Sequence, residues 1–212
     1  MTKIRFISFG LLLTVSMTTV VFNSCSKTDA SRQDNGVVIN GVKWATRNVD
    51  APGTFAAHPE DLGMFYQWNR KKAWSATGDV TGWVNYDSIA YSWEKSNDPS
   101  PKGWRVPTLE EIKTLFDANK VSNEWTTENG INGRKFVDKA TGKTLFLPAA
   151  GYRHINCGTL CDIGSRGSYW SSSEFPIGRG GNAYALFFVS DSAIWYNGFG
   201  GTFGSSVRVV AE

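Results

Sequence analysis

Short apolar runs separated by glycine and polar residues dominate this chain, and they predict short antiparallel strands. The segment from Val37 to Trp44 contains two such runs, one on either side of Asn40-Gly41. Asn-Gly is the strongest short hairpin signal, because both turn positions require a positive φ angle. We therefore expect a β-hairpin at the start of the folded region.

Six further segments have the alternation, or the β-branched and aromatic content, that is typical of strands. They are Met64–Trp68, Arg134–Val137, Thr144–Leu147, Ala183–Val189, Ala193–Asn197 and Ser206–Val210. The second and third are predicted to form a hairpin around Thr141-Gly142. The stretch from Lys71 to Asn97 has no clear period, so we expect a long excursion of loops.

The clearest helix is predicted to begin directly after Pro107. Thr108 is a suitable N-cap, and Glu111 lies three places later, where its carboxylate can bond back to complete a capping box. One apolar face follows, made of Leu109, Ile112, Leu115 and Phe116. The helix is expected to end near Asn119.

The N-terminal pattern is that of an export leader. Lys3 and Arg5 precede an uncharged, mostly apolar stretch from Phe6 to Phe22, and small polar residues then lead to Cys25. A cysteine in this place resembles a bacterial lipoprotein signal, in which it becomes the acylated N-terminus. We predict a signal peptide over 1–24, lipidation of Cys25, a polar tether over 25–36 and one domain over 37–212. The alternative is a retained membrane-spanning anchor.

Composition and charge favour an extracytoplasmic β domain over a nucleic-acid-binding one. Aromatic residues make up 14% of the chain, with nine Trp, whereas charged residues make up only 19%. Once Lys3 and Arg5 leave with the leader, 20 basic residues face 19 acidic ones, and the net charge falls from +3 to +1. No basic stripe is present, so nucleic acid is not an expected partner.

Six phrases of the sequence occur in an order typical of one bacterial family. They are Gly41–Val49, Pro59–Trp68, Gly103–Thr108 with Glu111, Phe146–Arg153, Gly167–Ser173 and Ser206–Val210. Together they resemble the Fibrobacter succinogenes major paralogous domain, which is common in lipoproteins of Bacteroides-type bacteria. The resemblance covers about residues 37–212.

The resemblance implies a fold more than an activity. It implies an α+β, C-type lectin-like fold, with short antiparallel strands, one or two helices and long loops. Members often carry cysteine at the positions of Ser100 and Val209, so it also implies that a disulfide has been lost here as a pair. The family has no agreed biochemical activity.

Two cysteines remain once Cys25 is assigned to the lipid. Cys157 and Cys161 flank a three-residue turn and are predicted to form a disulfide. Free thiols are the main alternative. A metal site with His154 lacks a clear fourth ligand. A copper oxidase related to formylglycine-generating enzymes would need copper at this pair, whose spacing and surroundings do not match that family.

The tryptophans divide into an expected core group and a group of candidate ligand contacts. Trp44, Trp68, Trp104 and Trp170 lie inside the family phrases and are expected to be buried. The candidate ligand-binding residues are Trp74, Trp83, Trp93, Trp195 and Tyr196. Exposed rings can stack on the apolar faces of sugars. The alternative for each ring is that it pins its loop to the body of the domain.

No catalytic residue, metal site or cofactor is predicted, and the protein is not expected to be an enzyme. Ser171–Ser173 lack a nucleophile elbow, and only His58 and His154 are available as a base. The calcium-binding triplets of C-type lectins are missing from the sequence, so any sugar is expected to bind without calcium. Glu60 and Asp61 are candidates for salt bridges to Arg47 or Arg105.

These observations predict a surface lipoprotein that acts as a binding module. It is expected in the cell envelope, at the outer membrane, held by its N-terminal lipid. The expected ligand is a carbohydrate or a host or matrix protein. The alternative role is a structural or tip component of a surface appendage or envelope assembly, which would bind protein partners.

Overall fold

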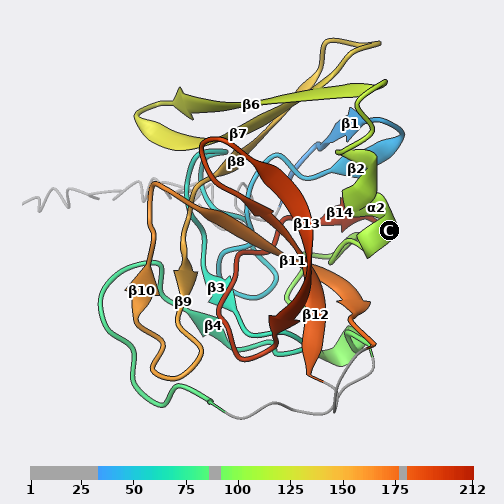
Figure 1. Ribbon diagram of the computed structural model, residues 1–212. Helices are drawn as coiled ribbons and strands as arrows, with labels where there is room; N and C mark the ends of the chain where they lie inside the picture. The colour runs from blue at the N-terminus through green and yellow to red at the C-terminus, as the bar shows by residue number, and fades with distance from the viewer. Residues whose placement is uncertain (1–32, 86–91, 177–180) are drawn as a thin grey trace, which may run out of the picture.

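The computed structural model describes residues 33–85, 92–176 and 181–212, and in these the chain is mostly β-sheet (Figure 1). Strand accounts for 39% and helix for 5%. The described strands form five small antiparallel sheets, of two to four strands each. Cys25, the leader over 1–24 and most of the predicted tether lie outside the described residues.

A four-stranded sheet joins the start, middle and end of the domain, in the order β1-β2-β14-β5. Its strands are β1 (Val37–Ile39), β2 (Val42–Trp44), β14 (Val210–Ala211) and β5 (Trp104–Arg105). The β1–β2 turn has φ of 45° at Asn40 and 83° at Gly41. The predicted Asn-Gly hairpin is therefore confirmed, with both turn residues in the left-handed region.

Two three-stranded sheets and two hairpins complete the architecture. The first three-stranded sheet contains β6 (Val121–Glu128), β7 (Ile131–Asp138) and β8 (Thr144–Pro148); the second contains β11 (Gly167–Glu174), β12 (Asn182–Phe188) and β13 (Ala193–Gly200). The hairpins pair β3 (Phe65–Tyr66) with β4 (Ala73–Trp74), and β9 (Tyr152–Arg153) with β10 (Leu160–Cys161). In Figure 1 the β6–β7–β8 sheet lies at the opposite end of the molecule from these two hairpins.

The single described α-helix, α2 (Leu109–Thr114), has the predicted start but not the predicted end. The Thr108 side chain accepts the Glu111 N–H, and the Glu111 carboxylate accepts the Thr108 N–H, so the capping box is confirmed. The helix ends at Thr114 and not near Asn119. The Asp117 carboxylate accepts the Asn119 N–H at 3.1 Å, a local turn that competes with helix continuation. A short 3-10 turn, η1 (Lys95–Asn97), lies before β5.

The predicted α+β, C-type lectin-like fold is wrong. The described chain holds several small antiparallel sheets and one short helix, with nothing that indicates a C-type lectin-like fold. The eight-residue strand β6 was not expected, because Ser122, Asn123 and Glu124 hide any apolar alternation. β6 is a strand because it pairs along its whole length with β7, which supplies its backbone hydrogen bonds.

Three clusters of buried side chains form the core. One lies between α2, the N-terminal hairpin and the two three-stranded sheets, one surrounds Trp68 and Trp170, and a small one surrounds Phe65 and Trp74. Trp44, Trp68 and Trp170 are buried as expected, whereas Trp104 is only partly buried. None of the helices among the described residues has the length and apolar character needed to span a bilayer.

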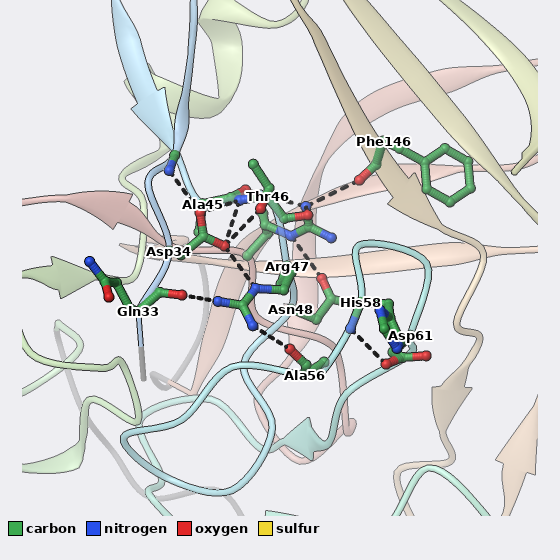
Figure 2. A network of polar contacts seen from close by, with 12 residues as sticks. Gln33, Asp34, Ala45, Thr46, Arg47, Asn48, Ala56, His58, Asp61 and Phe146 are labelled. Atoms are coloured by element: carbon green, nitrogen blue, oxygen red, sulfur yellow. Dashed lines mark hydrogen bonds and ion pairs between the residues drawn. The ribbon is translucent and has the colours of Figure 1, made fainter. Parts of the chain in front are cut away.

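A polar network attaches the described N-terminal segment to the core (Figure 2). The Asp34 carboxylate accepts the Thr46 N–H at 3.1 Å, the Thr46 hydroxyl at 2.8 Å and the Arg47 Nε–H at 3.2 Å, and its side chain is 1% exposed. Burial acts to raise the pKa of Asp34, but these hydrogen bonds and one from the Gly36 N–H outweigh it and lower the pKa. The predicted salt bridge of Arg47 to Glu60 or Asp61 is replaced by this contact with Asp34.

Replacing Asp34 by asparagine should lower the free energy of unfolding at pH 7 by about 1–2 kcal/mol, because charge-assisted hydrogen bonds are lost. Since the folded-state pKa lies below the ordinary value of 3.8, this stability is present above about pH 4 and is lost as the pH falls through the folded pKa. Urea unfolding at pH 7 and pH 3 measures the loss of stability at each pH, and Asp191→Asn, a change at an exposed position, is the control. A difference between Asp34→Asn and the parent that does not shrink at pH 3 contradicts this assignment.

Candidate functional site

A surface pocket of about 270 Å³ lies between η1, β5, the start of α2 and β11. We call it the Trp93 pocket, and it is lined by Trp93, Lys95, Asp98, Arg105, Thr108 and Glu212, among others. Its volume is just below the ~300 Å³ that marks the lower end of small-molecule sites. Six of its eight lining residues are polar or charged, so it is more polar than the mostly apolar sites that bind small molecules.

Arg105 is held in the pocket by Glu111 through two parallel hydrogen bonds. The Arg105 Nη1 lies 2.8 Å from Glu111 Oε2, and Nη2 lies 2.5 Å from Oε1. The same carboxylate accepts the Thr108 N–H at 2.8 Å, so the cap of α2 also fixes the guanidinium. The hydrogen bond with Glu111 raises the pKa of Arg105. Burial acts to raise the pKa of Glu111, but the bonds from Arg105 and Thr108 outweigh it and lower the pKa.

Asp98 is oriented by backbone groups on both sides of β5. Its carboxylate accepts the Ser100 N–H at 2.8 Å and the Val106 N–H at 3.2 Å. These bonds leave lone pairs on both oxygens, because an ionised carboxylate has about four acceptor sites. Asp98 and Arg105 therefore present a fixed acceptor and a fixed donor to the same pocket.

Trp93 forms a wall of the pocket and is not an open platform. Its side chain is 9% exposed, and its ring packs edge-on against Trp68 with centroids 6.1 Å apart. The indole N–H donates to the Asn97 carbonyl at 3.1 Å. At the rim, Lys95 Nζ lies 3.6 Å from Glu212 Oε1, with both side chains largely in solvent.

Opposite charges are matched inside the Trp93 pocket. Lys95 and Arg105 are positive, Asp98 and Glu212 are negative, and Glu111, which is paired with Arg105, adds a third carboxylate. Since each cation already has a carboxylate partner, the pocket does not favour an anion, and its charged groups can bond to neutral hydroxyl groups. The geometry suits a small, neutral ligand rich in hydroxyls.

The structure does not bring the five predicted contact residues onto one face. Trp74 is buried and packs against the partly buried Trp83, with ring centroids 4.8 Å apart. The indole of Trp83 donates to the Ile155 carbonyl at 2.9 Å, so these two rings join loops to each other. Trp93 lies in another cluster. Trp195 and Tyr196 are 41% and 44% exposed and lie on β13.

The predicted disulfide between Cys157 and Cys161 is not formed in the structure, where both are free thiols. The Cys157 sulfur instead lies 3.1 Å from the Thr159 hydroxyl, and the Cys161 sulfur lies 3.7 Å from the Thr159 carbonyl. Within the described residues, no group of three or more His, Cys, Asp or Glu side chains could hold a metal ion.

Sequence reasoning missed most of the Trp93 pocket. Asp98, Arg105 and Glu212 were not singled out as ligand contacts, because they are separated by up to 114 positions and belong to no motif. The capping box was the one usable signal: its carboxylate, Glu111, also needs a cation, and Arg105 lies just before the helix.

Comparisons with known protein families, with curated proteins and with solved structures found no match. The site is therefore interpreted from its own geometry.

Proposed function

We propose that this protein is a lipid-anchored envelope protein whose β domain binds a small, neutral saccharide in the Trp93 pocket. The observation that carries the proposal is one pocket with an aromatic wall, a fixed guanidinium and a fixed carboxylate. Membrane attachment through a lipid on Cys25 is part of the proposal. Its support is the sequence alone: the leader pattern and the resemblance to lipoproteins of the Fibrobacter succinogenes major paralogous family.

The choice of a saccharide follows from the shape of the polar groups. Adjacent hydroxyls on a sugar ring are spaced to accept two hydrogen bonds from one guanidinium and to donate two to one carboxylate. Arg105 and Asp98 are both planar groups whose orientation is set by protein contacts, so little side-chain entropy is lost on binding. The mostly buried ring of Trp93 lines the pocket and adds apolar surface to it.

Binding without calcium follows from the same contacts. Calcium takes six to eight oxygen ligands, usually several carboxylates. In the Trp93 pocket the Glu111 carboxylate is occupied by Arg105, and the Glu212 carboxylate faces Lys95. We therefore expect EDTA to leave saccharide binding unchanged.

Replacing Arg105 by glutamine should weaken saccharide binding about tenfold or more, because hydrogen bonds to a charged group are worth about 1.5–3 kcal/mol. The full chain in detergent micelles is screened on an array of neutral and acidic glycans, with and without EDTA, and hits are titrated calorimetrically. Lys71→Gln, an exposed cation outside the pocket, is the control and should bind as the parent does. The rim variant Lys95→Ala should lose less than about threefold in affinity, since the Lys95 side chain is 93% exposed.

Two results would contradict the saccharide proposal. One is that the folded parent chain binds no glycan on the array. The other is binding that Arg105→Gln leaves intact while its circular dichroism and thermal midpoint match the parent, because the ligand would then lie elsewhere.

One specific observation favours the alternative role, that of a structural component of a surface appendage or envelope assembly. Strand β13 pairs only with β12 among the described strands, and it exposes Ile194, Trp195 and Tyr196. An exposed apolar edge strand can receive an extended segment of another protein as an added strand. If the glycan array is silent and the chain is recovered from membranes in larger species that Trp195→Ser disperses, the appendage or assembly role replaces the saccharide proposal.

A further inference from the structure

The loop that carries Cys157 is held rigidly between β9 and β10. The His154 N–H donates to the Thr159 carbonyl at 2.8 Å, and the Gly158 N–H donates to the His154 carbonyl at 2.9 Å. Gly158 has φ of 70°, and an added Cβ would lie 2.6 Å from the Trp83 ring, so backbone and ring are in direct contact. This loop is therefore a fixed platform and not a loose excursion.

A buried arginine also holds this loop in place. Arg153 has 0% exposure, and its guanidinium donates to the carbonyls of Ser75, Gly78 and Gly158, among others. These bonds tie the 154–158 loop to the 75–78 segment. The backbone next to the exposed Cys157 is therefore anchored to the protein interior.

Cys157 lies exposed on this platform with two polar neighbours. Its sulfur is 3.1 Å from the Thr159 hydroxyl and 3.7 Å from His154 Nδ1. Hydrogen bonds from the side chain and backbone of Thr159 lower the pKa of Cys157. An exposed thiol whose sulfur has polar neighbours, and whose pKa is lowered, has the surroundings of a reactive cysteine.

The second thiol is placed differently. Cys161 lies in β10 opposite Tyr152, is only partly buried, and its sulfur lies 3.7 Å from the Thr159 carbonyl. Both sulfurs therefore contact the same residue, Thr159, one at its hydroxyl and the other at its carbonyl. The outer thiol lies beside a hydroxyl, whereas the inner one donates to a backbone carbonyl.

We propose that Cys157 and Cys161 form a dithiol that reduces small disulfides, with Cys157 as the attacking thiol and Cys161 as the resolving thiol. The Cys157 thiolate attacks one sulfur of the substrate R–S–S–R, forming a mixed disulfide and releasing R–S⁻. Cys161 then loses its proton and attacks the Cys157 sulfur, forming the internal disulfide and releasing the second R–S⁻. The protein loses two electrons, the substrate gains them, and two R–SH result.

The free pair in the structure corresponds to the reduced reactant of this single reaction, and the disulfide expected from the sequence is its oxidised product. Closing it requires Cys157 to leave the Thr159 hydroxyl.

The test uses the full chain in detergent micelles, reduced and desalted, with bis(2-hydroxyethyl) disulfide as the probe. The parent should release two equivalents of mercaptoethanol and gain an internal disulfide. Peptide mass mapping locates that disulfide and shows whether Cys25 has reacted as well. Cys161→Ser should release one equivalent and retain a mixed disulfide on Cys157. Cys157→Ser should react at least tenfold more slowly, and Thr159→Val should slow the first step severalfold.

Three results overturn the proposal. One is equal rates for Cys157→Ser and Cys161→Ser, and another is a parent that stops at the mixed disulfide. The third is a Cys161→Ser chain that carries no adduct on Cys157. Circular dichroism of each variant confirms that the fold is kept, and the saccharide titration of the same variants should be unchanged, since the Trp93 pocket contains neither cysteine.

Discussion

Replacing Arg208 by methionine is expected to lower the free energy of unfolding by about 1–3 kcal/mol for each buried acceptor that is left without a donor. Arg208 is 1% exposed. Its Nε–H donates to Asn48 Oδ1 at 2.9 Å, and its Nη1 donates to the carbonyls of Thr46 at 2.7 Å and Phe146 at 3.1 Å. The side chain thus joins the C-terminal segment, the segment after β2 and strand β8.

The cost of removing Arg208 comes from the acceptors left behind. Burial lowers the pKa of Arg208 to about 10, which shows that the charge itself is held at a desolvation cost. The buried guanidinium therefore adds little net stability compared with apolar side chains packed in the same place. Once the domain is built around it, however, its loss leaves the Asn48 amide oxygen and buried carbonyls without donors, at about 1–3 kcal/mol for each that water cannot reach.

Urea unfolding followed by circular dichroism measures the effect, with Lys71→Met as an exposed control that should change stability by less than about 0.5 kcal/mol. A second variant, Arg208→Lys, keeps a charged donor at this position and should lose less stability than Arg208→Met. An Arg208→Met chain as stable as the parent would show that this network contributes no net stability.

Replacing Gly151 by alanine is expected to cost at least about 2 kcal/mol more than the same change at Gly164. Both glycines have left-handed backbone angles, with φ of 75° and 77°. An added Cβ at Gly151 would lie 2.2 Å from the Cys161 carbonyl oxygen, whereas at Gly164 nothing lies within 4 Å. Comparing the two variants therefore separates the steric clash of the added Cβ from the left-handed backbone strain. That strain alone costs about 1 kcal/mol.

The crowding at Gly151 affects the fold because backbone cannot move aside as a side chain can. The Gly151 N–H donates to the Arg166 carbonyl at 2.7 Å, and Gly151 forms an isolated bridge with Gly167, the first residue of β11. Any shift that relieves the clash must disturb these contacts or the β9–β10 hairpin. Thermal unfolding of both variants is the measurement, and equal melting temperatures would contradict the crowding assignment.

Features with a local cause could be predicted from the sequence. The Asn40-Gly41 turn follows from the positive φ angles that these residues tolerate, and the Thr108–Glu111 cap follows from hydrogen bonds within four residues. The hairpin between β7 and β8 follows from two apolar runs and a short turn. In each case the residues that cause the structure are neighbours in the chain.

Strand β6 and the length of α2 could not be read in this way. The polar residues of β6 become a strand because β7 offers eight paired positions, a partner that no local pattern reveals. The helix was extended too far on apolar spacing, since Leu115 and Phe116 continue the apolar face while the Asp117 turn ends the helix. The fold class was wrong for the same reason, because helix content and sheet arrangement depend on pairing between distant segments.

The sequence by itself determined the local turns, the helix cap and the expectation that Trp44, Trp68 and Trp170 are buried. Only the tertiary structure decided the candidate site. Pairing of β5 with β14 brings Arg105 opposite Val210, so that Glu212 reaches the pocket that also holds Asp98 and Trp93. It also buried Trp74 while leaving Trp195 in solvent. Local propensity acts over a few residues, whereas burial and the meeting of charges depend on which distant strands pair.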